Sequence, residues 1–261
     1  MSMHSHIDFG YPALVIYGHL LVTLVALPLA LLAYRRKWSR WILLPALLLS
    51  LWSLASFALI RFGLDLNGRA SLPTNSFLAS GSGRVLDMGA GSGRSAIMVL
   101  EARPRATLVA LDLFGDEYDN HFGSAGPAQD SLQLGKARLL SNFRAAEVES
   151  RATIQAGDMR QMPLESGGFD AIVSSYAIDH LNSKGIQQSL AEANRVLKPN
   201  GEFLLMVVSK DIWMQLTWGP VFFHGGTRPA TRWTQLLNEA NFNILEQGAK
   251  PATLYFLARK R

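Results

Sequence analysis

The sequence of 261 residues contains no cysteine. Disulfide bonds, thiolate metal sites and cysteine nucleophiles are therefore excluded. Enzymes that depend on an essential thiol, such as those that handle arsenic or mercury, are disfavoured for the same reason.

Acidic residues are almost absent from the first 63 positions. Asp8 is the only one, against five basic residues: Arg35, Arg36, Lys37, Arg40 and Arg61. This segment therefore carries 5 − 1 = +4 of the net charge of +5, and the rest of the chain carries 20 − 19 = +1. A nearly neutral globular part is a poor partner for nucleic acid, so we expect no nucleic-acid ligand.

Two long runs without charge occupy the same segment, at residues 13–33 and 41–60. Each has the length of about 20 residues that a helix needs to cross about 30 Å of hydrocarbon. The sequence RRKWSR lies between them, and tyrosine and tryptophan lie mostly near their ends, as at membrane interfaces. A signal peptide would need positive charge before the first run, and MSMHSHIDFG has none. We therefore predict that residues 1–63 form a membrane anchor of two apolar helices, a helical hairpin.

Small side chains form a stripe along the second run. Ala46, Ser50, Ser53 and Ser56 are spaced by four, three and three positions, which suits close helix contact in lipid. The stripe can join the two helices of one chain or join two chains in a homo-oligomer. His19 in the first run is costly in lipid unless it faces protein or water, so we interpret it as a helix-contact or interface residue.

The composition changes after the second run. Residues 64–82 are rich in Gly, Ser and Asn and indicate a linker. Residues 83–261 alternate short apolar runs with amphipathic segments, which is typical of a mainly parallel sheet covered by helices on both faces. We expect strands at 84–88, 107–113, 152–156, 169–175, 202–208, 242–247 and 253–259, and helices near 92–102, 131–146, 184–196 and 231–240. The last two strands, joined by GAKPA, are expected to pair as an antiparallel edge.

The stretch VLDMGAGSGR, residues 85–94, places three glycines directly after a strand. A strand that ends at a glycine turn and continues into a helix directs backbone N–H groups toward a ligand. The dinucleotide pattern G-x-G-x-x-G needs a glycine at its sixth position, but Arg94 stands there. G-x-G-x-G preceded by an acid, Asp87, instead resembles the nucleotide-binding turn of class I S-adenosylmethionine (SAM)-dependent methyltransferases.

Three later features agree with that resemblance. Asp112 ends the second strand, 23 residues after Gly89, and Asp158 follows the third strand. The segments FDAIVSSYAIDHL and RVLKPNGEFLLMVV resemble the fourth strand, its helix and the fifth strand of the family. The resemblance covers residues 83–261 and is closest to the small-molecule and quinone-biosynthesis branch. It implies an α/β fold with a doubly wound, seven-stranded, mainly parallel Rossmann-like sheet, and SAM as the cofactor.

The resemblance also implies which residues contact that cofactor. Asp112 would take the ribose hydroxyls, Asp158 the adenine amine, and Asp87 would hold the glycine loop. The full set expected at the cofactor is Asp87, Gly89, Ala90, Gly91, Ser92, Gly93, Asp112, Leu113, Asp158, Met159, Ser174 and Ser175.

SAM carries an activated methyl group, so alignment of the acceptor and exclusion of water supply most of the rate. A base is needed only for acceptors such as alcohols and phenols. His180 is the first candidate for that base, and Tyr176 would face the transferred methyl. We expect no metal site, because the acids of GDEYDNH (115–121) are more typical of a solvated loop.

Residues 209–230 are expected to form the acceptor side of the site. Their apolar density, beside a membrane anchor, favours a hydrophobic small molecule, a quinone or a lipid as acceptor. The residues expected to line this pocket are Trp213, Trp218, Phe222, Phe223 and His224. We thus expect a membrane-anchored methyltransferase. Two alternatives stay open: a soluble acceptor with the hairpin only as an address, and a SAM-binding membrane module without catalysis.

The expected location contains a conflict. Two spanning helices place RRKWSR on the side opposite the domain, and the positive-inside rule would then put the domain outside the cytoplasm. Because SAM is made in the cytosol, we expect the domain on the cytoplasmic side of a bacterial inner (plasma) membrane. Either the second run does not span, or the rule is broken.

Overall fold

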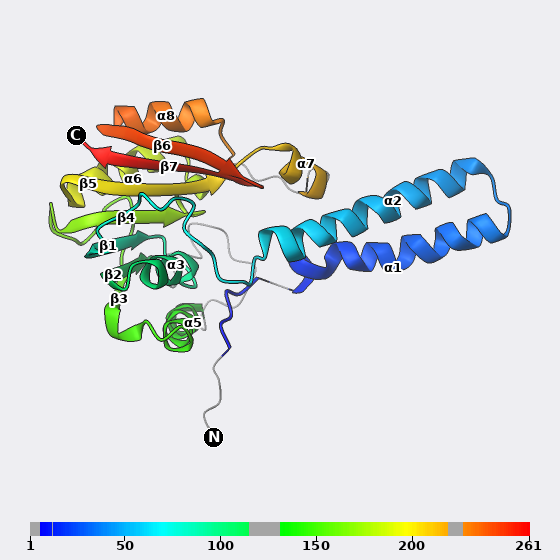
Figure 1. The fold of residues 1–261 in the computed structure, drawn as a ribbon, viewed down its shortest axis with the longest axis horizontal. Helices are drawn as coiled ribbons and strands as arrows, with labels where there is room; N and C mark the ends of the chain where they lie inside the picture. Colours follow the sequence, from blue (N-terminus) through cyan, green and yellow to red (C-terminus); the bar gives the residue numbers. More distant parts are fainter. Residues whose placement is uncertain (1–5, 12, 115–130, 219–226) are drawn as a thin grey trace, which may run out of the picture. The chain divides into compact units, whose positions relative to one another are not determined.

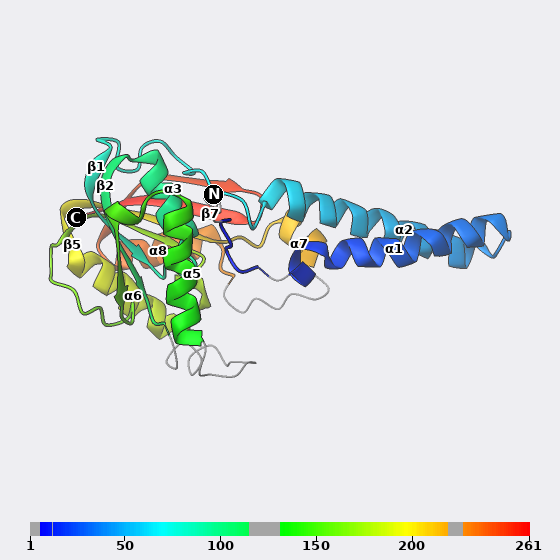
Figure 2. The ribbon, with the colours of Figure 1, turned by 90° about the horizontal axis from the view of Figure 1, so that it is seen from below.

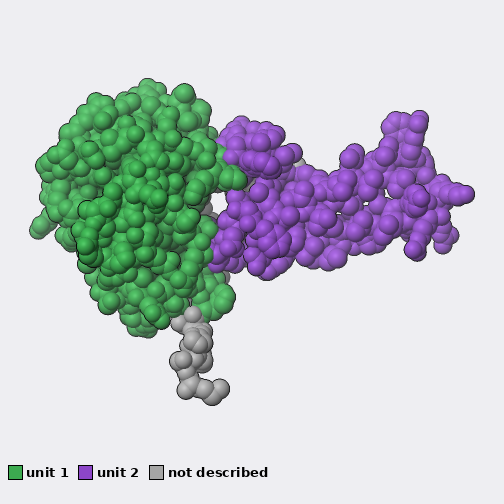
Figure 3. All heavy atoms as spheres, in the orientation of Figure 1, with its two compact units in different colours: residues 1–9, 69–209, 224–261 green, residues 10–68, 210–223 purple. Residues whose placement is uncertain are grey.

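In the computed structural model, residues 6–11, 13–114, 131–218 and 227–261 are described. The chain divides into two compact units, coloured separately in Figure 3. The sheet unit comprises residues 1–9, 69–209 and 224–261, and the hairpin unit comprises residues 10–68 and 210–223.

The sheet unit contains a seven-stranded sheet with the order β3-β2-β1-β4-β5-β7-β6 (Figure 1). Its strands are β1 (Ser82–Met88), β2 (Arg105–Asp112), β3 (Ala152–Ala156), β4 (Phe169–Ser175), β5 (Leu197–Val208), β6 (Phe242–Lys250) and β7 (Thr253–Lys260). Strands β1 to β5 are parallel, and β7 runs antiparallel to both β5 and β6. The predicted doubly wound, mainly parallel sheet is therefore confirmed, together with its antiparallel edge. The strand order reverses between β1 and β4, which is where ligands bind in open sheets of this type.

Helices cover both faces of this sheet because its strands alternate their side chains between the two faces. Leu86 and Met88 belong to one buried cluster with side chains of α6 (Ser183–Val196) and α8 (Ala230–Glu239). Asp87 points the other way and bonds to Ser95 of α3 (Arg94–Ala102). The helix α5 (Ser131–Ala145) contributes Asn142, which bonds to the loop before α3. Figure 2 shows α3 and α6 on opposite faces of the sheet.

The segment predicted as a linker is partly packed on the sheet unit. The Phe77 side chain is fully buried, and the Arg103 guanidinium donates to the carbonyl oxygens of Asn75 and Phe77 at 2.8 Å and 2.6 Å. Residues 69–82 lack a regular helix or strand before β1 but belong to the compact sheet unit.

The hairpin unit contains α1 (Ala13–Arg35), α2 (Arg40–Ala58), a π-helical turn η1 (Leu59–Leu64) and α7 (Ile212–Trp218). The side chains buried in α1 and α2 are mostly small or polar: Ile16, His19, Thr23, Ala26, Ala30, Ala33, Ala46, Ser50, Ser53 and Ser56. Leucines of both helices face outward. The helices at Ala13–Arg35 and Arg40–Leu64 are long and apolar enough to cross a membrane. That they do so stays a prediction.

Candidate functional site

The turn after β1 is built from glycines in the left-handed region. Gly89, Gly91 and Gly93 have φ angles of +84°, +50° and +89°. The N–H groups of Gly89 and Ala90 both donate to the carbonyl oxygen of Leu111, at 2.9 Å and 3.0 Å. These bonds fix the turn to the end of the neighbouring strand β2. The Ser92 carbonyl oxygen accepts a hydrogen bond from Asn142 at 2.8 Å.

The space around this turn differs between two of its glycines. A β-carbon added to Gly89 would lie 2.3 Å from the Ala177 Cβ and 3.0 Å from the Met159 Cε, so the protein itself fills that side. A β-carbon added to Gly91 would meet no atom within 4 Å among the described residues. Among the described residues, the open side of the turn therefore lies above Gly91.

Asp112 ends β2 at this open side. Its Oδ2 accepts the Gly91 N–H at 2.7 Å, and its Oδ1 accepts the Leu113 N–H at 2.8 Å. Burial raises the pKa of this carboxyl, while the two amide hydrogen bonds oppose the shift. The carboxylate is thus held between two backbone donors at the carboxyl end of β2, where it can accept the hydroxyls of a ribose.

Asp87 has a different environment from Asp112. Its side chain is fully buried, and the Ser95 hydroxyl lies 2.9 Å and 2.7 Å from its two oxygens. Burial raises the pKa of Asp87 from 3.8 to about 7, and the charge of Asp112 adds to that shift. Asp87 therefore links β1 to the first turn of α3, the two elements that flank the glycine turn.

Asp158 follows β3 and forms an ion pair with Arg160. The Arg160 guanidinium donates to the carboxylate at distances down to 2.6 Å, and the Arg160 N–H donates to Asp158 Oδ1 at 2.8 Å. The Asp158 carboxylate is therefore shared with Arg160, and an adenine amine would have to compete for it. Met159, the next residue, packs against the main hydrophobic core of the sheet unit.

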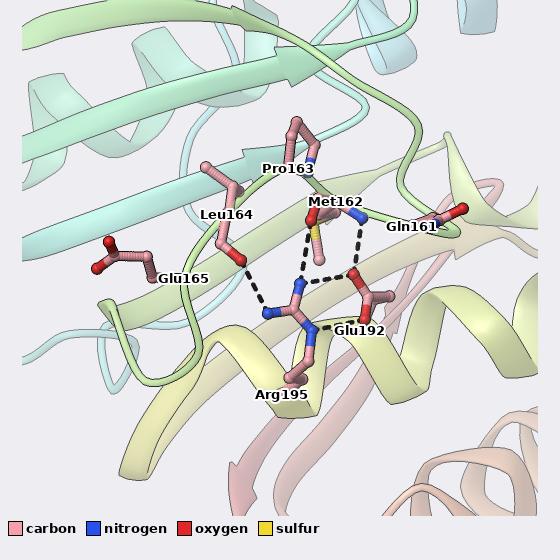
Figure 4. A pocket seen from close by; sticks show the side chains of 7 residues that line it. All are labelled: Gln161, Met162, Pro163, Leu164, Glu165, Glu192 and Arg195. Atoms are coloured by element: carbon pink, nitrogen blue, oxygen red, sulfur yellow. Dashed lines mark hydrogen bonds and ion pairs between the residues drawn. The ribbon is translucent and has the colours of Figure 1, made fainter.

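Two charged residues of α6 hold the loop that follows β3 and contains Asp158 and Met159. The side chains of Glu192 and Arg195, from α6, enclose an open hollow of about 530 Å³ with the loop residues Gln161–Glu165 (Figure 4). Arg195 donates to the carbonyl oxygens of Leu164 and Met162 at 2.8 Å and 3.1 Å, and Glu192 accepts the Met162 N–H at 2.7 Å. The hydrogen bonds from Arg195 hold the pKa of Glu192 below its usual range. Arg195 and Glu192 therefore attach the loop after β3 to α6. Because these polar groups already bind one another, we do not interpret the hollow as a ligand site.

The residues after β4 occupy the expected acceptor end. The Tyr176 hydroxyl lies 2.6 Å from the Thr253 hydroxyl, and Tyr176 itself has a φ of +52°. His180 ends a short 3₁₀ turn, η3 (Ile178–His180), with an exposed side chain. The Ser174 hydroxyl donates to the Met88 carbonyl oxygen at 2.8 Å and therefore joins β4 to β1.

Two contacts near the carboxyl ends of the strands were not predicted from the sequence. The first is Asp179, whose buried Oδ2 accepts the Val208 N–H at 3.0 Å, while its Oδ1 has no hydrogen-bond partner among the described residues. The second is Asn142, which exchanges two hydrogen bonds with the backbone of Asp8, at 2.9 Å and 2.8 Å. Phe9 is buried there, with the Arg94 guanidinium 6.0 Å from its ring centre.

The residues predicted for the acceptor pocket lie only partly within the described chain. Trp213 and Trp218 belong to α7, in the hairpin unit. Phe222, Phe223 and His224 lie outside the described residues, as does the acidic stretch 115–121.

Known proteins share this sequence pattern and this fold. The family described as Methyltransferase domain matches residues 86–205. The ubiquinone/menaquinone biosynthesis C-methyltransferase UbiE of Syntrophotalea carbinolica is 29% identical over 58% of this chain and 54% of its own length. A malonyl-acyl-carrier-protein O-methyltransferase of Laribacter hongkongensis is 30% identical over 51% of this chain and 40% of its own length. A SAM-dependent methyltransferase from Aquifex aeolicus aligns with a TM-score of 0.52 and 14% identity, over 69% of this chain and 82% of that one.

Residues 86–205 therefore match a methyltransferase domain in sequence, and the sheet unit has the fold of a solved SAM-dependent methyltransferase. The chain spans about half the length of the curated relatives that it matches. Those relatives methylate different acceptors by name, so the acceptor of this chain does not follow from the similarity.

Proposed function

We propose that this protein is a membrane-anchored, SAM-dependent methyltransferase that methylates a hydrophobic acceptor held in the bilayer. One observation carries the membrane part of this proposal. The two long helices of the hairpin unit place small and polar side chains against each other and large apolar side chains outside.

This arrangement suits lipid as the surrounding solvent. Leu24, Val25 and Leu48 have exposed fractions of 62%, 74% and 64%, although each lies in the middle of a long helix. In water such a surface would be a large apolar patch, which soluble monomers rarely expose. In a bilayer, small residues between helices and leucines toward lipid are the expected pattern.

The chain's own residues supply the binding site. The open side of Gly91 can accept the nucleoside, Asp112 can hold its ribose hydroxyls, and Asp87 keeps the loop in place. SAM supplies an activated methyl group on a sulfonium when it is bound. The protein must then align the acceptor and exclude water, and proximity supplies most of the rate. His180 and Tyr176 are our candidates for contact with the acceptor.

The proposed anchor and one of the curated relatives support a hydrophobic acceptor. A hairpin in the bilayer confines the enzyme to the surface where an apolar acceptor partitions, which raises their effective concentration. UbiE of Syntrophotalea carbinolica is named for quinone biosynthesis. We therefore propose a quinone or a similar apolar ring compound as the acceptor class, methylated on the cytoplasmic side where SAM is made.

The first test measures cofactor binding by calorimetry, with full-length protein in detergent. Wild-type protein should bind SAM, and Asp112→Ala should weaken binding by about 1.5–3 kcal/mol, because a charge-assisted contact is lost. Glu165→Ala serves as the matched control, since Glu165 lines the hollow near α6 and not the glycine turn. Equal affinity of wild type and Asp112→Ala would show that the ribose is bound elsewhere.

The second test measures methyl transfer from SAM labelled in its methyl group. The probe is a quinone that lacks one ring methyl group, supplied in its reduced hydroquinone form so that the ring carbon is nucleophilic, with a long isoprenoid tail in one arm and without the tail in the other. Label should enter the tailed quinone in vesicles faster than the short one in solution. Equal rates would favour a soluble acceptor, with the hairpin as an address. SAM binding without transfer to either probe or to a total lipid extract would favour a non-catalytic module.

A further inference from the structure

We infer that α7 is a third, lipid-facing helix of the hairpin unit, held there by His19 and Trp52. In this position it would admit an apolar acceptor directly from the bilayer. The inference rests on the proposed function and adds to it the route of the acceptor and the two residues that fix that route.

Two ring N–H groups of the hairpin contact the last turn of α7. The His19 Nε2 lies 2.8 Å from the Thr217 carbonyl oxygen, and the Trp52 Nε1 donates to the Leu216 carbonyl oxygen. A carbonyl oxygen only accepts, so the His19 Nε2 carries the proton in this contact. The last carbonyls of a helix have no partner within the helix. His19 and Trp52 therefore cap α7 with donors from two different helices, α1 and α2.

The two capping rings also support each other. The His19 and Trp52 rings are 5.2 Å apart between centres, at an angle of 63°, which is an edge-to-face arrangement. His19 is buried, and its carbonyl oxygen accepts a hydrogen bond from Thr23, whose hydroxyl lies 2.7 Å from that of Ser53. A histidine within an apolar helix is costly in lipid unless it has a protein partner. The Thr217 carbonyl is that partner, which explains why this residue type occurs at position 19.

The other side of α7 is apolar and exposed, as are the outer faces of α1 and α2. Ile212, Trp213 and Leu216 are 58%, 48% and 48% exposed, whereas the Thr217 side chain is buried. Positions 212, 213 and 216 share one face of a helix. This face belongs to the same compact unit as the outward leucines of α1 and α2. If lipid surrounds those leucines, we expect it to cover the exposed face of α7 as well.

The place of His19 along α1 gives the depth of the contact. It follows Ala13 by six residues, or about 9 Å of helix, in a helix of 23 residues. The contact therefore lies toward the end of α1 that is farther from the charged RRKWSR turn. A short helix with one apolar face and a tryptophan suits the boundary between headgroups and acyl chains at that end.

The chain itself connects this helix to the strand that ends at the acceptor side. Only Ser209, Lys210 and Asp211 separate the end of β5 from the start of α7. The Asp211 carboxylate accepts the Met214 N–H at 2.8 Å and so begins the helix at once. A membrane position of α7 therefore brings the segment after β5 to the lipid. His19 and Trp52 are positioning residues for the acceptor, not catalytic ones.

The absence of cysteine allows a direct test by spin labelling. Trp213→Cys, labelled and placed in phosphatidylcholine–phosphatidylglycerol vesicles, should be relaxed by oxygen, which concentrates in lipid, more than by a water-soluble nickel chelate. Leu48→Cys is the reference for the hairpin itself. His19→Leu and Trp52→Phe each remove one donor and should increase the undocked, nickel-accessible fraction at position 213 by about 3- to 20-fold. His19→Gln keeps a donor and should restore the docked state, and Trp41→Phe, at the far end of α2, should change nothing.

The two reference labels separate the failure of this inference from that of the anchor. A Leu48 label that is exposed to nickel would overturn the membrane anchor itself. A Leu48 label in lipid with a Trp213 label in water would overturn only the inference on α7. An unchanged Trp213 label in both His19→Leu and Trp52→Phe would show that these residues do not hold the helix.

A kinetic measurement distinguishes positioning from general stability. With the tailed quinone probe, His19→Leu and Trp52→Phe should raise KM about 3- to 20-fold while the Kd for SAM stays unchanged. With the tailless probe in solution, KM should not change. Equal loss with both probes, or weaker SAM binding, would indicate a merely structural role.

Discussion

The two units of this protein bury opposite kinds of side chain. The sheet unit encloses large apolar residues, such as Trp233, Phe203 and Leu86, which are fully buried. The hairpin unit encloses Ala33 and Ser53 and leaves its leucines exposed. The sheet unit is built for water, and the inverted hairpin is the reason why we propose lipid around it.

The largest difference in the free energy of unfolding should come from a leucine-to-serine substitution made once in each unit. Leu86→Ser places a hydroxyl in a fully buried strand position and removes apolar contacts, so it should destabilise the sheet unit by about 3–5 kcal/mol. Leu48→Ser changes a side chain that is 64% exposed on the hairpin and should leave the folding of both units almost unchanged. Thermal unfolding of the full-length protein in detergent micelles measures both. A comparable loss in the two variants would mean that Leu48 is buried against protein.

The second effect separates two glycines of the same turn. Gly89→Ala combines a φ of +84° with a contact of 2.3 Å to the Ala177 Cβ, so we expect a loss of about 2–5 kcal/mol in the free energy of unfolding. Gly91→Ala has only its φ of +50° against it and should cost about 1–2 kcal/mol.

Calorimetry with SAM completes this comparison. The methyl group of the introduced alanine enters the open side of the turn. Gly91→Ala should therefore bind SAM more weakly although the protein stays folded. If Gly91→Ala kept full affinity for SAM, the nucleoside would not lie above this glycine.

The sequence allowed the sheet to be predicted almost completely. All seven strands were expected close to their observed positions, because each is a short apolar run bounded by glycine, proline or polar residues. The doubly wound, mainly parallel arrangement followed from the resemblance to the methyltransferase family, and the structure adds the strand order. The inner stripe of the second helix, with Ser50, Ser53 and Ser56, was also visible as a spacing of small residues.

The contacts between distant segments could not be predicted in the same way. Residue spacing gives the face of a helix but not its partner, so the capping of α7 by His19 and Trp52 had no local signal. The same is true of Asn142 and the backbone of Asp8, which are 134 residues apart. At the cofactor site, the sequence located the strand ends at Asp87 and Asp112, and the structure adds which hydrogen bonds each carboxyl makes. The roles of these residues stay predictions.

A third effect concerns pH and belongs to the sheet unit alone. Burial raises the pKa of Asp87 to about 7 in the folded protein, against 3.8 for an ordinary aspartate. Between those two values the folded state binds more protons than the unfolded state. The free energy of unfolding should therefore fall as the pH rises from about 4 to about 7, by on the order of a few kcal/mol, and then level off.

Asp87→Asn provides the comparison for this effect, because it keeps the shape of the side chain and removes its titration. Thermal midpoints at pH 5 and pH 8 should differ less in Asp87→Asn than in the wild type; a smaller difference remains because burial also raises the pKa of Asp112. The same slope in both proteins would assign the pH dependence to another group. Leu48→Ser, in the hairpin unit, should keep the slope of the wild type.

The smallest effect compares one buried serine hydroxyl in each unit. In the sheet unit, Ser174 donates to the Met88 carbonyl oxygen at 2.8 Å, and Ser174→Ala should cost about 1 kcal/mol, as for a typical hydrogen bond. In the hairpin unit, the Ser53 and Thr23 hydroxyls lie 2.7 Å apart between α2 and α1. Hydrogen bonds between membrane helices average about 0.6 kcal/mol, because helices that have separated in lipid find other partners. A double-mutant cycle with Thr23→Val and Ser53→Ala, measured by unfolding in micelles, should therefore give a coupling near that value and below the cost of Ser174→Ala. A coupling of several kcal/mol would show that the polar contacts hold the hairpin together, rather than the close packing of its small side chains.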